Sequence, residues 1–342
     1  MITRHKVDGS SHFSVHRQVK RHVHNHLKAA QLQNAFDWAL KRLRQLFPRQ
    51  SPYAEPLSNR IKGCSEWISH IIAINRAASL LKETLQLPQL LAQLFQDGAT
   101  YLWARGLLEE GKGLTLAAKE ICESHKDCDQ LLIGEVYSFH ACILSDSGDI
   151  DQAATYFERS AQNRREHLFR LKQNHQTADM LDEILLANAY NNLAGIYCAQ
   201  GRYSDAELYN ELSLGIKKRW EKQSNLSYLL TLSYQNIAMV YARRGKFDDA
   251  AIYFEKAIAL SDPDESMVRR ALTFHNYGSM RYAQGLVALA QELMEQAFQL
   301  KWESLGDHYD TATSLHMLAA CYQAQKSEDS LIVARYCSPR QS

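Results

Sequence analysis

Histidine and cysteine clusters in this chain of 342 residues stand at spacings that could bind a metal. The candidates are the pairs His12/His16 and His22/His26, and the segment Cys122-x-x-His125-x-x-Cys128. A spacing of four places two imidazoles on one face of a helix, but neither histidine pair has the carboxylate partner of zinc peptidases. The cysteine segment offers only three ligands at a non-standard spacing. We therefore interpret these clusters as helix surface and loop, and we predict no metal and no cofactor.

Nucleophilic catalysis has no recognisable motif in the sequence. The G-x-S-x-G pattern of serine hydrolases is absent, and none of the seven cysteines lies in a context typical of a catalytic nucleophile. An enzyme or accessory protein of small-molecule metabolism would need a closed pocket with convergent acid–base groups. The candidates for such a pocket are Cys198, His275 and Tyr282. We predict that the protein is not an enzyme and keep this pocket as an alternative.

Asparagine recurs at Asn192, Asn236 and Asn276, at intervals of 44 and 40 residues. A carboxamide both donates and accepts hydrogen bonds, so an evenly spaced row of asparagines suits the backbone of an extended peptide. An alternative interpretation is that each asparagine satisfies a carbonyl of a neighbouring helix. The sequence leaves both interpretations open.

The asparagines belong to a longer pattern that occurs twice. It reads N-L-A-x-x-Y-x-x-x-G-x-Y-x-x-A-x-x-Y from Asn192, and N-I-A-x-x-Y-x-x-x-G-x-F-x-x-A-x-x-Y from Asn236. Apolar residues at helical spacing on both sides of a glycine predict a helix, a turn and a second helix. Glycine marks five such turns, at Gly106, Gly148, Gly201, Gly245 and Gly285, and a sixth copy begins but is not completed. The longest step between turns is explained by an insertion around residues 164–182, which predicts longer helices with a polar tip.

This pattern resembles the tetratricopeptide repeat, because several positions match together at fixed spacing. Its long period is similar to that of kinesin light chains and of filamentous-fungal NB-ARC proteins. The resemblance implies an all-α fold, a right-handed α-solenoid of about five and a half helix pairs over residues 89–337, with a tail at residues 338–342. It also implies a concave groove that binds a peptide. The positions that face this groove in the repeat include Asn192, Gln235, Asn236, Arg243, His275, Asn276 and Tyr282. The resemblance implies that the three asparagines hold the peptide backbone, and we predict that Arg243, His275 and Tyr282 select side chains.

The first 88 residues are organised differently. Residues 1–12 are polar and unpatterned, which predicts a disordered arm. The segment Phe13–Val19 begins a basic helix and resembles the segment that closes the winged-helix part of NB-ARC signal-transducing ATPases, with His16 at the position that contacts nucleotide in that family. The resemblance implies a winged-helix-like remnant at residues 13–50 and a helical connector at residues 51–88. Because the phosphate-binding sequence G-x-x-x-x-G-K-[ST] is absent, we expect no nucleotide binding.

Composition supports a soluble helical protein, with 46% apolar and 23% charged residues and a net charge of +1. Residues 1–50 carry an excess of basic side chains, but these are spread through predicted helices and not clustered. We therefore expect neither a nucleic-acid nor a membrane partner. The cysteines are scattered and odd in number, and neither a signal peptide nor a membrane-spanning apolar stretch is recognisable, so we expect a cytoplasmic protein.

The predicted function is a non-enzymatic scaffold that binds a protein or peptide partner in the groove. A second possibility from a different class is a truncated NB-ARC-derived regulatory protein, of the incompatibility type, that acts on intact relatives. The third is the small-molecule pocket named above. The incomplete sixth repeat leaves a helix without its partner, and self-association through this C-terminal end is a further expectation.

Overall fold

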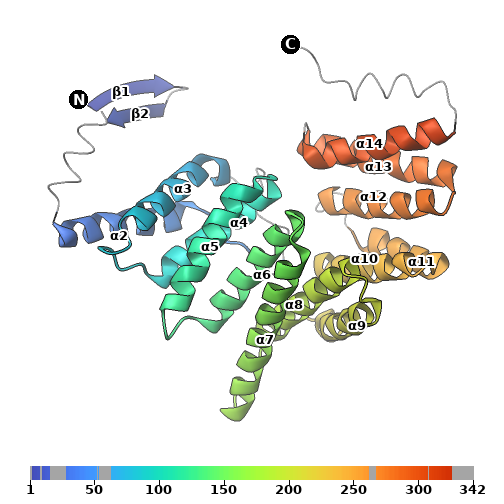
Figure 1. Ribbon diagram of the computed structural model, residues 1–342, viewed down its shortest axis with the longest axis horizontal. Helices are drawn as coiled ribbons and strands as arrows, with labels where there is room; N and C mark the ends of the chain where they lie inside the picture. Colours follow the sequence, from blue (N-terminus) through green and yellow to red (C-terminus); the bar gives the residue numbers. More distant parts are fainter. Residues whose placement is uncertain are drawn as a thin grey trace.

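The computed structural model describes residues 2–7, 10–15, 28–51, 53, 63–261, 267–306 and 308–325. In these ranges the chain forms thirteen α-helices and one two-stranded hairpin, and the helices stack one after another into an extended array (Figure 1). The array confirms the predicted fold class.

Helices are paired from residue 89 onward, as the repeat pattern predicts. Two helices come first: α2 (Ala29–Leu46) and α3 (Cys64–Leu80). The pairs are α4 (Gln89–Ala104) with α5 (Leu108–Ser124), α6 (Gln130–Asp146) with α7 (Ile150–Gln173), α8 (Met180–Ala199) with α9 (Tyr203–Trp220), α10 (Ser227–Arg243) with α11 (Phe247–Leu260), and α12 (Met267–Ala283) with α13 (Val287–Leu305). Helix α14 (Tyr309–Ala324) begins the incomplete sixth pair.

The glycine of the sequence pattern makes the turn inside each pair. Gly201 has a φ of 76° and Gly245 a φ of 74°, in the left-handed region that glycine adopts without steric cost. After the first of these turns, the N–H of Arg202 donates to the carbonyl of Tyr197 at 2.8 Å, which closes the end of α8. The repeated glycine therefore produces the repeated helix pair directly.

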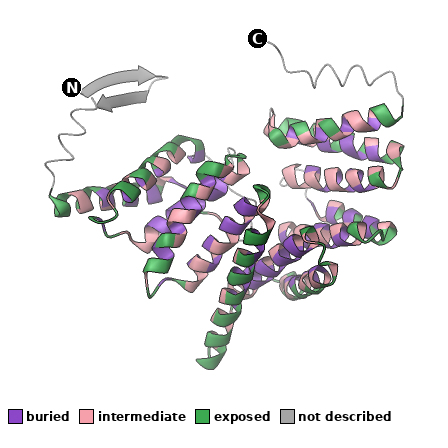
Figure 2. Cartoon of the chain, in the orientation of Figure 1, coloured by how far each residue is buried: buried purple, intermediate pink, exposed green. Residues whose placement is uncertain are grey.

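Small and aromatic residues then bring the two helices of a pair together. Ala206 and Ala250 are fully buried at equivalent places on α9 and α11, where a larger side chain would separate the helices. Tyr197 of α8 packs on Tyr209 of α9 with ring centroids 5.6 Å apart, and the next repeat contains an equivalent tyrosine pair at the same distance. Burial is accordingly concentrated on the facing sides of the helices (Figure 2).

Helix α7 is the longest helix among the described residues, with 24 residues. It projects beyond its neighbours, and its far end is exposed (Figures 1 and 2). This confirms the longer helix and polar tip that the sequence predicts for the insertion in the second repeat.

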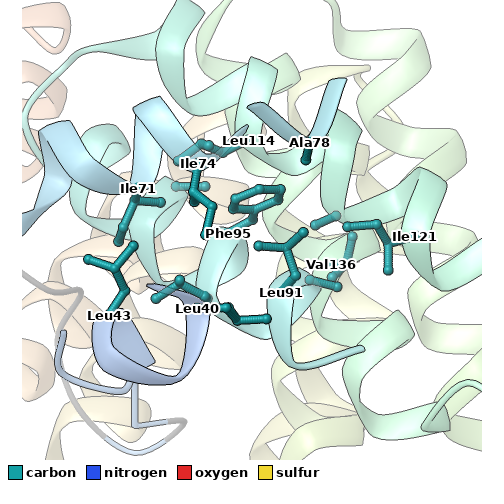
Figure 3. Packing of buried hydrophobic residues seen from close by; sticks show 14 of the residues in the cluster. Leu40, Leu43, Ile71, Ile74, Ala78, Leu91, Phe95, Leu114, Ile121 and Val136 are labelled. Atoms are coloured by element: carbon teal, nitrogen blue, oxygen red, sulfur yellow. The ribbon is translucent and has the colours of Figure 1, made fainter. Parts of the chain in front are cut away.

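Helices α2 and α3 close the N-terminal end of the array. Leu40 of α2 and Ile71 of α3 pack with Phe95 of α4 in one buried cluster (Figure 3). Full burial of side chains of this size contributes on the order of 1.5–3 kcal/mol each. Arg44 of α2 also forms a buried ion pair with Asp97 of α4, with 2.5 Å between Nη1 and Oδ2. These contacts make residues from α2 onward part of the packed array.

The extreme N-terminus differs from the predicted disordered arm. Strand β1 (Ile2–Val7) pairs antiparallel with strand β2 (Ser10–Val15), and Arg4 lies opposite Phe13. The signal that would have predicted this hairpin is the dipeptide Asp8-Gly9, which favours a two-residue hairpin connection. The helix expected to start at Phe13 is a strand as far as Val15. His16 and the rest of that expected helix, to residue 27, lie outside the described residues.

Candidate functional site

The first helices of the repeats line one groove. Side chains of α4, α6, α8 and α10 surround a cavity of about 380 Å³, with Gln50 and Ser51 at one end and Arg269 of α12 contributing from the other side. Because equivalent positions of successive repeats face the same way, a groove along the first helices follows from the stacking. It is the place where the predicted site residues should meet.

Between α6 and α8 the lining of the groove includes residues of a second helix. There the second helix α7 contributes Phe157, Ser160 and Arg164 to the lining, whereas no other second helix of the described residues does so. Gly134 of α6 has no side chain to cover α7, and the Ser160 hydroxyl donates to its carbonyl at 2.7 Å. The floor of the groove at this place is therefore made by α7.

Asn192 and Asn236 both line this groove. The Nδ2 of Asn192 donates to Oγ of Ser138 at 2.9 Å, and the Nδ2 of Asn236 donates to the backbone carbonyl of Asn191, also at 2.9 Å. Each carboxamide therefore joins its helix to the preceding first helix, and Asn236 satisfies a helix carbonyl as in the alternative interpretation. Neither Oδ1 accepts a hydrogen bond from another described residue, so both oxygens are available to a ligand.

Asn276, the third asparagine of the row, lies on α12 outside the cavity lining. Its side chain is half-buried, and it makes no hydrogen bond to the rest of the described chain. Asn276 therefore occupies the equivalent position of its repeat, but only Asn192 and Asn236 line the cavity.

Gln235 and His275 lie between helices instead of in the groove. The Gln235 amide donates to the hydroxyl of Thr273, and Nδ1 of His275 is 2.9 Å from Oγ of Ser314. Each contact joins a first helix to the next one along the array. Burial lowers the pKa of His275 to about 4, with a smaller contribution from the nearby Lys301, so the ring is neutral at pH 7. These two predicted groove residues, of which His275 was expected to select a ligand side chain, link successive repeats in the described structure.

Arg243 and Tyr282 also lie away from the cavity. Arg243 is exposed in the last turn of α10, and Tyr282 packs against a buried cluster that includes Ala290 and Met294 of α13. None of the three residues of the alternative pocket, Cys198, His275 and Tyr282, lines the groove.

Charged groups that sequence reasoning missed occupy the groove. Asp97, Glu135 and Asp146 line it, as do Arg164 and Arg269. Their helices were predicted, but which of their side chains face the groove depends on how the helices pack.

Three of these charges have partners. The ion pair with Arg44 holds Asp97, although burial still raises the pKa of Asp97. Asp146 accepts from Nε1 of Trp103 at 2.5 Å, and Arg269 donates to the hydroxyl of Tyr228 at 2.9 Å. These charges are fixed by neighbouring helices before any ligand arrives.

Two residues of the segment Cys122-x-x-His125-x-x-Cys128 have a place in the packing of the helices. His125 Nδ1 lies 2.8 Å from the carbonyl of Ile121, and burial raises the pKa of the Cys122 thiol. Within the described ranges no group of three metal-binding side chains could hold an ion. His16, His22 and His26 lie outside those ranges.

No described helix combines the length and the apolar character needed to cross a bilayer.

Three segments match sequence models of the tetratricopeptide repeat: residues 134–167, 185–262 and 269–333. Together they cover just over half of the chain and include most of the helices from α6 to α14. The chain is a tetratricopeptide-repeat protein. Its first pair, α4 and α5, lies outside the matched segments but has the same left-handed glycine turn, with a φ of 71° at Gly106.

Solved structures resemble this tetratricopeptide-repeat protein over most of its length. A Rap protein complexed with competence and sporulation factor has a TM-score of 0.57 at 14% identity, covering 89% of this chain and 76% of that chain. NprR in complex with its cognate peptide NprX has a TM-score of 0.50 at 13% identity, covering 80% and 76%. A protein described as a kinesin light chain of Podosopora anserina, with nearly identical repeats, has 20% identity and a TM-score of 0.42, covering 59% and 92%. At these identities the likeness concerns the fold. No curated protein sequence matches the chain.

Proposed function

We propose that this tetratricopeptide-repeat protein is a non-enzymatic scaffold that binds an extended peptide segment of a partner protein in the groove of its first helices. The observation that carries the proposal is the pair Asn192 and Asn236, whose Oδ1 atoms are left free on the wall of the groove. NprR, which resembles this chain in fold, binds its cognate peptide NprX. That neighbour supports peptide binding as a use of the fold and says nothing of which peptide binds here.

The two asparagines suit a peptide backbone because their orientation is fixed in advance. Each Nδ2 is held by a neighbouring helix, so each Oδ1 is presented without further loss of side-chain freedom. A peptide N–H that donates to such an oxygen replaces a hydrogen bond to water, with a net gain of about 1 kcal/mol. Asn276, whose carboxamide is free of described partners, extends the row for a peptide that is long enough to reach α12.

The test uses a random heptapeptide library panned against the protein, with the affinity of selected peptides measured by fluorescence anisotropy. The double variant Asn192→Ala/Asn236→Ala is expected to weaken binding about tenfold or more, because two backbone hydrogen bonds are lost. Gln299→Ala is the matched control, since it removes an exposed carboxamide on the second helix α13, away from the groove lining. Circular dichroism verifies that each variant is folded. Equal affinity of the double variant and the control would refute the groove as the binding site.

The two other functions considered from the sequence find no specific support in the described residues. The NB-ARC-derived regulatory role depends on Phe13–Val19, most of which lies outside those residues. The metabolic pocket depends on Cys198, His275 and Tyr282, none of which lines the groove. Self-association through the incomplete repeat would involve α14 together with residues after 325, which are also outside the described ranges.

A further inference from the structure

Arg164 is a buried cation that the packing of the repeats does not satisfy. It is 3% exposed, lines the groove floor from α7, and makes no hydrogen bond or ion pair with any other described residue. Its Nη1 atom is fully buried without a partner. A buried guanidinium left in this way lowers stability, and such groups in native proteins are commonly explained by function.

Gly134 makes room for this guanidinium. A β-carbon at Gly134 would lie 2.7 Å from Oδ1 of Asn163, 2.8 Å from Nε of Arg164 and 2.9 Å from Cζ of Arg164, closer than atoms of this kind approach. Glycine therefore allows these side chains to approach the backbone closely and does not make a turn, since residue 134 lies inside helix α6. The guanidinium is seated directly against the backbone that bears Glu135.

Glu135 faces the same cavity and is also without a partner. It lines the groove and makes no hydrogen bond to the described part of the chain. Burial raises the pKa of Glu135 to about 6, against the opposing effect of Arg164, so the carboxylate is mostly ionised at pH 7. Yet the two side chains form no ion pair, although they lie close enough for each to influence the charge of the other. One donor group and one acceptor group therefore line the same part of the groove unpaired.

The ligand that fits must accept from Arg164 and donate to Glu135. A ligand carboxylate would satisfy the guanidinium but would be repelled by Glu135, and by Asp129 and Asp182, whose charges also act on Arg164. An ammonium or guanidinium group would satisfy Glu135 but would be repelled by Arg164. A primary carboxamide is neutral and has both a carbonyl acceptor and an amide donor.

We infer that the pocket between α6 and α8, with Arg164 at its floor and Glu135 beside it, binds the side chain of an asparagine or glutamine in the peptide. The carboxamide oxygen accepts from the Arg164 guanidinium, and its NH₂ donates to the Glu135 carboxylate. Phe157 of α7 adds apolar surface, and Asn188 and Asn192 of α8 form the opposite wall. The inference rests on the proposed function and assigns the side chain that the groove selects.

The experiment compares peptides selected from the random heptapeptide library by the wild-type protein and by two variants. Wild-type binders are expected to show asparagine or glutamine at one fixed position, and changing that residue to glutamate, lysine or alanine should weaken binding about tenfold or more. Glu135→Gln removes the acid and should shift the preference at that position to aspartate or glutamate. Arg164→Met removes the guanidinium and should shift it to lysine or arginine. These opposite shifts are not expected if the two residues are only structural.

A third variant addresses the case in which Arg164→Met does not fold. Gly134→Ala keeps both charges but displaces the guanidinium, and it should weaken the asparagine- or glutamine-containing peptide about tenfold without creating a preference for basic residues. Selected peptides whose composition is the same for wild type, Glu135→Gln and Gly134→Ala would overturn the inference. If those peptides still lose affinity with Asn192→Ala/Asn236→Ala, the groove proposal stands while this pocket is rejected. A library that yields no peptide dependent on the two asparagines would overturn both.

Discussion

Lys217 offers a sharp test of how burial acts on charge in this array. It lies on α9, is 0% exposed, and its Nζ donates to the carbonyl of Leu229 at 3.2 Å and to Oγ of Ser233 at 2.9 Å. No carboxylate among the described residues pairs with it, and burial lowers the pKa of Lys217 to about 7. We predict that Lys217→Met stabilises the protein at neutral pH.

The magnitude follows from the difference between the folded and unfolded pKa values. A fall from 10.5 to about 7 corresponds to about 5 kcal/mol of destabilisation when the lysine is charged in both states. The loss of two hydrogen bonds in the variant offsets about 1 to 3 kcal/mol of this, which leaves a net gain of about 2 to 4 kcal/mol. Because the folded pKa is lowered, the penalty is fully present below pH 7 and disappears as the pH rises towards 10.5. At pH 9.5 the gain should therefore be close to zero or slightly reversed.

Urea unfolding followed by circular dichroism at pH 7 and pH 9.5 measures both values. Lys218→Met is the matched control, because Lys218 is the neighbouring lysine on the same helix and is exposed. Its stability should stay within about 0.5 kcal/mol of wild type at both pH values. Destabilisation by Lys217→Met at pH 7, or a difference from wild type that does not change between the two pH values, would refute the reasoning.

Three further predictions concern contacts between repeats. Asn236→Ala should lower the free energy of unfolding by about 1 kcal/mol, because it loses an inter-helix hydrogen bond. Asn276→Ala should change the free energy of unfolding by less than about 0.5 kcal/mol, and equal effects of the two variants in urea unfolding would contradict this. Arg44→Met should cost about 3–5 kcal/mol by leaving Asp97 buried without its cation, and adding Asp97→Asn should recover most of the loss; a thermal melt of the double variant no better than that of the single variant would argue against the ion pair. Because burial lowers the pKa of His275 to about 4, the stability of the protein should fall as the pH drops below about 6.5. His275→Gln should reduce that fall between pH 6.5 and 4.5, and identical stability profiles of wild type and variant would show that the His275 ring is not responsible.

The helix pairs were predictable because each depends on local chemistry. Gly201 makes the turn between two helices, and the small Ala206 on the second helix lets the pair pack closely. Both residues lie within a segment of about twenty residues, and the same pattern is found in the next repeat. The N-terminal hairpin was missed although its signal, Asp8-Gly9, is equally local. Its strands are short, and their apolar residues do not alternate strongly with polar ones.

The adjacent residues Gln235 and Asn236 show which feature of the site the sequence did not predict. Gln235 and Asn236 were both assigned to the groove, but successive helical residues point about 100° apart. The angle between neighbouring helices decides which of the two faces the cavity. In the structure Asn236 lines the groove, while Gln235 contacts the next helix. A rotation of α10 by about 100° would be needed to exchange these roles, and the sequence pattern does not specify the rotation of the helix.

The sequence by itself determines the number, type and order of the repeats, because turn conformation and helix-face patterning are properties of short segments. Tertiary structure alone decides which polar groups meet, since this depends on the rotation and spacing of whole helices. Arg164 illustrates the difference. It stands in a segment whose composition predicted an exposed polar tip, yet the approach of α6 to α7 at Gly134 buries it at the floor of the groove. The repeats follow from local chemistry, whereas the charge in the groove follows from how those repeats stack.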